Sequence, residues 1–361
     1  MPPAPTDVPF AQELRIATAA VQQAARLTQT AAATLRAQPG AALDKPDNTP
    51  VTVADLGAQA LLVAALRAAF PADAFLGEES AAMLRADSAL AARVWELVSA
   101  VAGAEGAAEV PPPRDQAHMM DLIDLAGMGE GGRKGRCWVM DPIDGTATYL
   151  KGQQYVVALC LVVDGVQRVG VLACPNMSLE GGKVSEDNVA GDGSNGYLVS
   201  AVSGHGAWIR PLSWGKLQDP SPVRLAHPNP PLEDLILVES LAATSMDHEK
   251  HKQVAEKLGC EWPSTDIWCL QMKYIACAVG GHDAVIRIPR EDWHRTCVWD
   301  HAGGQLIFEE AGGKVTDIHG KDIDFGAGKR CYNNLGNVIA PVAVHGQILR
   351  VVQEILGQSK P

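Results

Sequence analysis

The chain has 361 residues, of which 47% are hydrophobic and 20% are charged, a composition typical of folded globular proteins. Its formal net charge of −12 argues against binding to nucleic-acid polymers and to anionic membranes, because both repel an acidic protein. No apolar run approaches the ~18 residues of a membrane-spanning helix, and the N-terminus does not resemble a signal peptide. The eight cysteines form no CxxC pair, which favours reduced core thiols. We expect a cytoplasmic monomer, with the nucleus as the alternative compartment.

The N-terminal third is predicted to be largely helical. Residues 8–37 are rich in Ala, Leu, Gln and Arg, and their apolar positions recur near helical spacing. A second helix is predicted over Leu56–Phe70 and a third over residues 81–100. Between them, residues 74–76 form a short apolar run that indicates a buried strand. Residues 101–117 are rich in Gly, Glu and Pro, which is typical of an exposed loop.

Two acids stand at the ends of these elements. Asp55 precedes the second helix, and Glu78 follows the short strand in the sequence GEES. Each has an ordinary structural explanation, because an acid complements the dipole at a helix start and acids after a strand commonly form a solvated turn. Taken alone, neither residue indicates a site.

The centre of the chain carries the sequence WVMDPIDGT, in which Asp141 and Asp144 stand three residues apart after an apolar run. The proline between them fixes φ and leaves the Ile143 carbonyl outside a regular ladder. Gly145 and Thr146 then begin a predicted helix, whose N–H groups suit a phosphate. Carboxylates bind hard cations, so the segment suggests metal ions that hold a phosphate. A turn with two solvated acids is the alternative.

The remaining elements alternate between apolar strands and helices. Strands that are apolar on both faces, beside Ala-rich helices, predict a layered α/β sandwich. The proline-rich segment Pro228–Pro231 suggests a boundary between an N-terminal subdomain, residues 1–227, and a C-terminal subdomain, residues 228–361. The further elements are predicted over residues 155–163, 169–173, 196–200, 205–211, 235–239, 247–258, 268–279, 284–288, 305–311, 314–318 and 338–356.

Four charged residues of the C-terminal half occupy distinct positions in these elements. His248 lies on a polar helix, where an exposed histidine is the usual explanation. Lys273 is the single charged residue of an apolar helix, and Arg287 lies on one face of an alternating strand. Asp300 precedes a further apolar helix, where a helix cap is the alternative explanation.

Five carboxylates are thus presented at the ends of predicted elements, as a site for several metal ions requires. Two Mg²⁺ ions about 4 Å apart can activate a water and stabilise the leaving oxygen in a displacement on phosphorus. Bound cations would also let an acidic protein accept an acidic substrate. No Cys/His set has zinc spacing and no P-loop is present, which argues against zinc hydrolases and P-loop nucleotidases. The five acids are Asp55, Glu78, Asp141, Asp144 and Asp300.

These acids and their neighbours resemble the signatures of the inositol monophosphatase superfamily, the Mg²⁺-dependent, lithium-sensitive phosphatases. The match comprises Asp55, GEES at 77–80, DPIDGT at 141–146 and WDHAGG at 299–304. Within the superfamily the chain looks most like the fungal and plant 3'(2'),5'-bisphosphate nucleotidases, over most of residues 10–356. The stretches that carry this closer likeness are Lys45–Asp55, Glu130–Arg136, Asp164–Val166, Cys174–Asn176, Gln271–Tyr274 and Ile286–Pro289.

The resemblance implies an αβαβα sandwich with mixed sheets between helix layers. It implies hydrolysis of adenosine 3',5'-bisphosphate to AMP and phosphate, with 3'-phosphoadenylyl sulfate as a second substrate. It also implies two or three Mg²⁺ ions, with Asp141 bridging two of them and a weaker third ion near Asp55 and Glu78. The implied metal ligands are Asp55, Glu78, Asp141, the carbonyl of Ile143, Asp144 and Asp300.

The resemblance also implies roles around the substrate. Asp55 and the Thr146 hydroxyl would orient and deprotonate the attacking water. The N–H groups of Gly145 and Thr146 would hold the departing phosphate. The second phosphate and the adenosine would be contacted by His248, Lys273 and Arg287.

Two positions depart from the family pattern and bear on substrate preference. Leu270 stands where the family usually has a small hydroxyl residue before the substrate lysine, and Ala147-Thr148 replaces a Lys-Gly pair. The nearest alternative function is therefore an inositol polyphosphate 1-phosphatase or inositol-phosphate phosphatase with the same metal site. A catalytically silent protein that binds the nucleotide is an alternative of another class. The basic loop at 131–136, with Lys273 and Arg287, favours a substrate that carries a second phosphate.

Overall fold

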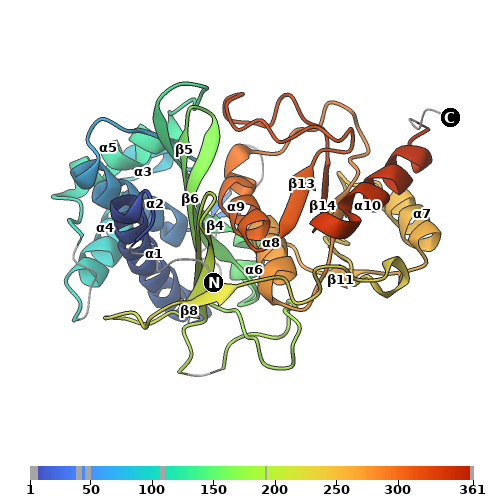
Figure 1. Ribbon diagram of the computed structural model, residues 1–361. Helices are drawn as coiled ribbons and strands as arrows, with labels where there is room; N and C mark the ends of the chain where they lie inside the picture. The colour runs from blue at the N-terminus through green and yellow to red at the C-terminus, as the bar shows by residue number, and fades with distance from the viewer. Residues whose placement is uncertain (1–6, 38–42, 45–49, 106–109, 192, 358–361) are drawn as a thin grey trace.

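The computed structural model describes residues 7–37, 43–44, 50–105, 110–191 and 193–357. Helices and sheets alternate in five layers, seen edge-on in Figure 1, so the predicted αβαβα sandwich is confirmed. None of the helices in the described ranges is both long and apolar enough to cross a lipid bilayer. Residues 45–49 of the resembling stretch Lys45–Asp55 lie outside the described residues.

The larger sheet has seven strands in the order β3-β4-β5-β6-β7-β8-β9. Only the β3–β4 pair is parallel, so the sheet is mixed, and every later pair is antiparallel. The pairing aligns the C-terminal ends of β3 and β4, where the acids of both strands stand. The strands are β3 (Ala74–Gly77), β4 (Arg136–Asp144), β5 (Val156–Val163), β6 (Val166–Cys174), β7 (Tyr197–Val202), β8 (Gly206–Pro211) and β9 (Ser221–Val223).

One face of this sheet is covered by the N-terminal helices (Figure 1), which bury their Ala and Leu positions in a common core. The single helix expected over residues 81–100 is two helices, because Asp87 accepts hydrogen bonds from the N–H groups of Ala89 and Leu90 and starts a new one. The helices are α1 (Ala11–Ala37), α2 (Val53–Ala69), α3 (Ala82–Ala86), α4 (Ser88–Ala102) and α5 (Gln116–Gly127), and a two-stranded ladder joins β1 (Leu43–Asp44) to β2 (Pro50–Val51).

The other face is covered by α8 (Leu270–Val279) and α9 (Ala302–Glu310). Helix α9 meets β6 backbone to backbone, since a Cβ added at Gly170 would lie 3.0 Å from the carbonyl oxygen of Gly303. A Cβ at Gly303 would in turn lie 2.5 Å from a methyl group of Leu172. Glycine at these two positions therefore fixes α9 close against the sheet.

The second sheet lies beyond α8 and α9, and α7 and α10 cover its outer face (Figure 1). Its strand order is β12-β14-β13, all antiparallel, with a short parallel pair β10–β11 beside it. The strand expected over 235–239 is reduced to β10. These elements are β10 (Val238–Glu239), α7 (His248–Leu258), β11 (Thr265–Asp266), β12 (Val285–Arg287), β13 (Gly313–Thr316), β14 (Asn337–Pro341) and α10 (Val342–Ile355), with single 3-10 turns at Leu232–Asp234 and Val298–Asp300.

The core between the large sheet and α8 and α9 contains residues from both sides of position 228. A second core fills the space between the small sheet, α7 and α10. The division into residues 1–227 and 228–361 stays a prediction, and the shared core makes the two parts closely packed.

Candidate active site

The acids predicted to bind metal gather at the C-terminal end of β4. Asp141 is 2% exposed. Burial raises its pKa well above the ordinary value, and the charges of Glu78, Asp144, Asp300 and Asp55 raise it further. All five predicted carboxylates are therefore close enough to act on one another, although they come from four separate segments of the chain.

The pKa of Asp300 shows that the protein alone compensates the negative charge of these carboxylates only in part. Burial, followed by the charge of Asp144, raises the pKa of Asp300 to about 8, and the positive charge of Arg287 opposes the rise only in part. Clustered buried acids that hold each other's pKa high are the arrangement that bound cations relieve. The donor set, carboxylates and the main-chain carbonyl of Ile143, consists of the oxygen ligands that Mg²⁺ prefers. The residues therefore fit divalent cations.

The end of β4 is shaped by its own side chains. The β4–β5 register shifts between Asp141 and Asp144, and the Asp141 carboxylate accepts a hydrogen bond of 3.1 Å from the N–H of Ile143. Gly145 follows with φ of 91°, a conformation that favours glycine, and an added Cβ would lie 2.8 Å from the hydroxyl of Thr148. The chain then enters α6 (Thr146–Tyr149). This turn presents the carboxylates and the first helical N–H groups side by side.

Asp144 is held by the loop that starts α8. One of its oxygens accepts hydrogen bonds from the thiol of Cys269 (3.0 Å) and from the N–H of Gln271 (2.5 Å). These bonds lower the pKa of Asp144, but burial outweighs them and the net direction is upward. Sequence reasoning missed both positioning groups, because Cys269 reads as a core thiol and a backbone N–H has no sequence signal.

Asp55 both caps helix α2 and contacts Thr146, its proposed catalytic partner. As part of a capping box, one oxygen accepts from the N–H (2.8 Å) and hydroxyl (2.6 Å) of Thr52. Its other oxygen lies 3.2 Å from the Thr146 hydroxyl, which is also 3.2 Å from the Ile143 carbonyl. One hydroxyl proton serves only one acceptor at a time, so Thr146 can donate to Asp55 and keep its oxygen open to a water.

Glu78 is positioned through its neighbours. The side chain of Gln59, on α2, donates to the carbonyl of Glu79 (2.6 Å) and accepts from its N–H (3.0 Å). A Cβ added at Gly77 would lie 2.6 Å from the Gln59 carbonyl oxygen. The turn after β3 is therefore built around a buried amide that the sequence gives no reason to single out.

The predicted cations Lys273 and Arg287 lie close to two of the acids, since the charge of Lys273 acts on Asp144 and that of Arg287 acts on Asp300. Lys273 is 2% exposed, and its ammonium group donates to the hydroxyl of Ser240. Burial and then the charge of Arg287 lower the pKa of Lys273 to about 7, with Asp144 opposing. In the described part of the chain, neither cation forms an ion pair with a carboxylate. A hydroxyl beside the lysine is thus present, supplied by Ser240 and not by position 270.

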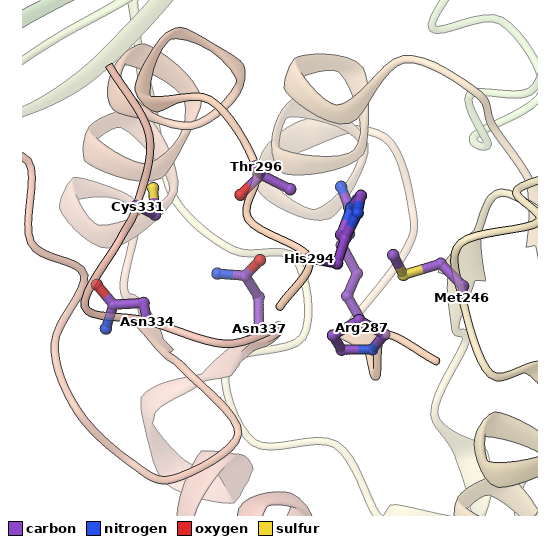
Figure 2. Close-up of a pocket in the computed structure, with 9 residues that line it drawn as sticks. Met246, Arg287, His294, Thr296, Cys331, Asn334 and Asn337 are labelled. Atoms are coloured by element: carbon purple, nitrogen blue, oxygen red, sulfur yellow. The ribbon is translucent and has the colours of Figure 1, made fainter. Parts of the chain in front are cut away.

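Arg287 also borders a small pocket (Figure 2). Burial lowers the pKa of its guanidinium, and the charge of Asp300 opposes this. The pocket collects polar groups from separate segments around the arginine. Its lining residues are Met246, Arg287, Pro289, His294, Thr296, Cys331, Asn334, Gly336 and Asn337.

His248 lies next to two residues that the sequence did not single out. Its Nδ1 is 3.4 Å from Glu239, and His251 on the same helix is 2.5 Å from the same carboxylate. One ligand atom from each of the three residues lies within 4.8 Å of the others, so the group is a geometric candidate for a metal. His251 is buried, in contrast to the exposed position usual for a histidine on a polar helix.

The basic loop at 131–136 contributes less than the sequence suggested. Arg136 pairs with Asp73 (2.8 Å) and Glu13 (3.0 Å), and Arg133 pairs with Asp324. Arg136 begins β4, about 16 Å from Asp141 at the usual rise of a strand. Both arginines therefore have structural partners, and the inference of a second phosphate rests on the other cations.

Residues 11–356 match the inositol monophosphatase family. The chain is 36% identical over 355 residues to the 3'(2'),5'-bisphosphate nucleotidase of Emericella nidulans, covering 96% of this chain and 99% of that protein. It is 35% identical over 354 residues to the 3'(2'),5'-bisphosphate nucleotidase of Oryza sativa, covering 96% and 95%. The inositol monophosphatase structure from Anabaena shares the fold, with a TM-score of 0.60 at 17% identity over 96% of this chain and 97% of that one. The chain belongs to the inositol monophosphatase family.

Proposed function

We propose that the protein is a 3'(2'),5'-bisphosphate nucleotidase, which removes the 3'-phosphate of adenosine 3',5'-bisphosphate to give AMP and phosphate. The observation that carries the proposal is the meeting of mutually repelling acids with the buried Lys273 and the half-buried Arg287, which lack carboxylate partners in the described residues. The acids suit metal ions and one phosphate, and the cations suit a second. Relatives that align along nearly the whole chain carry that name. We propose 3'-phosphoadenylyl sulfate as a second substrate.

The proposed cofactor is Mg²⁺, with two or three ions per site. Glu78, Asp141 and the Ile143 carbonyl would hold one ion, Asp141 with two further acids would hold a second, and Asp55 would lie near a weaker third. Bound there, the ions would neutralise phosphate charge and make water a nucleophile near neutral pH. The two further acids are Asp144 and Asp300.

The protein's own groups handle the proton. With its hydroxyl proton directed to Asp55, Thr146 offers an oxygen lone pair that orients a water for attack on phosphorus. The proton released by that water passes by way of Thr146 to the Asp55 carboxylate. The water oxygen bonds to phosphorus as the bond to the 3' oxygen breaks, and the 3' oxygen takes up a proton. The N–H groups of Gly145 and Thr146 hold the departing phosphate.

The second phosphate would bind Lys273, Arg287 and His248. A doubly charged group placed there would favour the charged form of Lys273, whose pKa is lowered by burial and by the charge of Arg287. An inositol monophosphate has no group for these cations. The proposal therefore favours a substrate with two phosphates.

Phosphate release tests the proposal directly. The protein should release phosphate from adenosine 3',5'-bisphosphate with Mg²⁺, and Li⁺ should inhibit. Inositol 1,4-bisphosphate separates the alternative, because faster release from it would indicate an inositol polyphosphate 1-phosphatase. Binding of the nucleotide without release would indicate a silent regulator. We further propose a monomer in the cytoplasm, which gel filtration and localisation of a tagged chain would test.

A further inference from the structure

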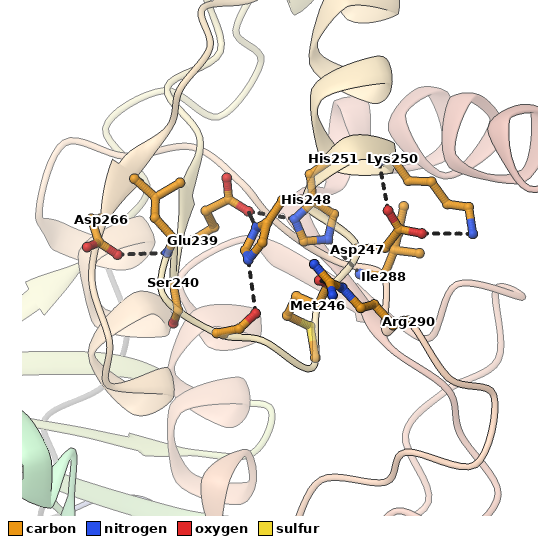
Figure 3. A network of polar contacts seen from close by, with 12 residues as sticks. Glu239, Ser240, Met246, Asp247, His248, Lys250, His251, Asp266, Ile288 and Arg290 are labelled. Atoms are coloured by element: carbon orange, nitrogen blue, oxygen red, sulfur yellow. Dashed lines mark hydrogen bonds and ion pairs between the residues drawn. The ribbon is translucent and has the colours of Figure 1, made fainter.

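A buried carboxylate–histidine pair lies outside the residues assigned above. Glu239 is 4% exposed at the end of β10, and His251 is 3% exposed on α7. Figure 3 shows them between His248 and the backbone of Ile288. Neither residue belongs to the proposed metal site. Burying the charge of Glu239 lowers stability unless other interactions compensate for it, so the pair calls for a structural or functional explanation.

The hydrogen bonds fix the proton positions in this group. Nε2 of His251 accepts a bond of 2.9 Å from the N–H of Ile288, so its proton is on Nδ1 and is donated to Glu239. Nε2 of His248 donates to the carbonyl of Ala243 (2.9 Å), which turns its Nδ1 toward the same Glu239 oxygen. His251 thus has no free lone pair for a metal. The group is a hydrogen-bonded relay in which the Glu239 carboxylate orients His251, and the Ala243 carbonyl orients His248 with its Nδ1 3.4 Å from the same carboxylate oxygen.

This relay adjoins Lys273. Ser240 follows Glu239 directly. Its hydroxyl lies within donating distance of the main-chain carbonyls of Ile267 and Trp268, either of which can take its one proton, and it accepts from the Lys273 ammonium group. The charge of Glu239 also acts on Lys273, raising its pKa against the effect of burial. Any shift of the Glu239 side chain or backbone is therefore transmitted to the lysine.

The relay adjoins Arg287 on its other side. Ile288, whose N–H is held by His251, is the next residue after Arg287, and its carbonyl accepts a bond of 2.8 Å from the N–H of Asp247. Helix α7 and the residue after β12 are thereby joined through both backbone polar groups of Ile288. The direction in which Arg287 leaves its strand depends on this junction.

We propose that Glu239 and His251 are positioning residues for the anion-binding side of the substrate site. The pair holds three side chains of the proposed phosphate subsite, from three separate segments, in one arrangement. The identity of the second phosphate rests on the proposed function. The three are His248, Lys273 and Arg287.

Two histidine variants separate the halves of the relay. In His251→Asn the amide nitrogen takes the place of Nδ1 and keeps the bond to Glu239, but nothing reaches Ile288. In His251→Gln the amide oxygen reaches the place of Nε2 and keeps Ile288, but Glu239 loses its donor. Glu239→Gln keeps an acceptor for His251 and removes the charge. Lys252→Gln, an exposed residue of the same helix, is the matched control.

The readout is calorimetric binding of AMP, whose 5'-phosphate occupies the subsite, compared with adenosine, which lacks it. We expect both His251 variants and Glu239→Gln to weaken the binding of AMP by about tenfold and that of adenosine by less than about twofold. In kinetics on adenosine 3',5'-bisphosphate, KM should rise and kcat should change little. Equal weakening of AMP and adenosine, or unchanged AMP binding, would overturn the positioning role. Glu239→Gln decides the question if the histidine variants do not fold.

The proposed function has its own signature in the same experiment. A wild-type protein that binds AMP more tightly than adenosine but releases no phosphate from adenosine 3',5'-bisphosphate would refute the nucleotidase while the relay is still tested by binding. A wild-type protein that hydrolyses the bisphosphate, with variants that keep AMP affinity, would refute only the relay.

Discussion

The acidic and the cationic sides of this site differ in how far the protein itself stabilises their charged groups. The acids of the metal side repel one another, and burial with Glu78, Asp144 and Asp300 raises the pKa of Asp141. The cationic side is already bonded before a ligand arrives, since Ser240 holds Lys273 and a buried carboxylate orients His248. The metal side is incomplete without ions, whereas the cationic side is preorganised by the protein. Loss of a group should therefore affect turnover on one side and affinity on the other.

The largest effect is expected for Asp144→Asn. Removal of the charge of a proposed metal ligand should lower kcat by at least about 100-fold. The melting temperature measured with a chelator should not fall, because the change removes a buried charge that repels its neighbours and the amide can still accept from Gln271. Asp121→Asn, at an exposed acid paired with Arg85, is the control. Near-normal turnover would contradict the role of Asp144 in metal binding.

Thr146→Ala should lower kcat by about 100-fold or more with little change in KM, because the proton route from water to Asp55 loses its hydroxyl. Thr146→Ser keeps the hydroxyl and should retain most activity. Steady-state kinetics on adenosine 3',5'-bisphosphate would measure both. A change confined to KM would refute the proposed proton route.

Lys273→Met should weaken the binding of a substrate that carries two phosphates. Loss of a buried, hydrogen-bonded cation should raise KM for adenosine 3',5'-bisphosphate by about 10- to 100-fold, with kcat much less affected. Hydrolysis of a substrate with one phosphate, such as inositol 1-phosphate, should not weaken in parallel. An equal loss on both substrates would place Lys273 on the metal side and remove the contrast drawn above. Lys252→Met serves as the exposed control.

The smallest effect concerns stability and involves His282, a 3% exposed histidine at the end of α8. Its Nδ1 donates to the Gly280 carbonyl (3.0 Å), and its buried Nε2 has no partner in the described residues. Burial lowers the pKa of His282 to about 4 from the usual 6.5, so the unfolded chain binds the proton first as the pH falls. Stability from this group is present above pH 6.5 and declines toward pH 4, by about 2 kcal/mol between pH 7 and 5.

Denaturant unfolding of the wild type and of His282→Asn at pH 7 and pH 5 would measure this. The asparagine keeps a donor for Gly280 but does not titrate, so the variant should lose less stability on acidification. An identical decline in both proteins would show that other groups cause it. Turnover at pH 7 should be unaffected, which separates this histidine from both sides of the site.

The acids proposed for the metal side could be singled out from the sequence, because each lies in a short, recognisable motif at or near the start or end of an element. Asp141 and Asp144 lie three residues apart, and parallel pairing of β3 and β4 brings Glu78 beside them. The αβαβα layers followed from the same resemblance. These features depend on local sequence, so one chain was enough to infer them.

The cationic side was only partly predictable, because its order comes from contacts between distant residues. Glu239 reads as the end of an ordinary strand, and His251 as one more polar residue of α7, until the fold places them against Ile288. The same limit applies to Arg136, whose partners Asp73 and Glu13 lie far away in the sequence. A buried carboxylate within reach of two histidines has no sequence pattern of its own.

The contact between Gly170 and Gly303 constrains how the enzyme can move. Asp300, the one predicted metal ligand from the C-terminal half, stands just before α9, and α9 itself contributes no side chain at Gly303, where its backbone faces Gly170 and Leu172 of β6. A helix seated so closely cannot swing outward without breaking main-chain packing. We therefore expect Asp300 to keep its position against the large sheet when the product leaves the site.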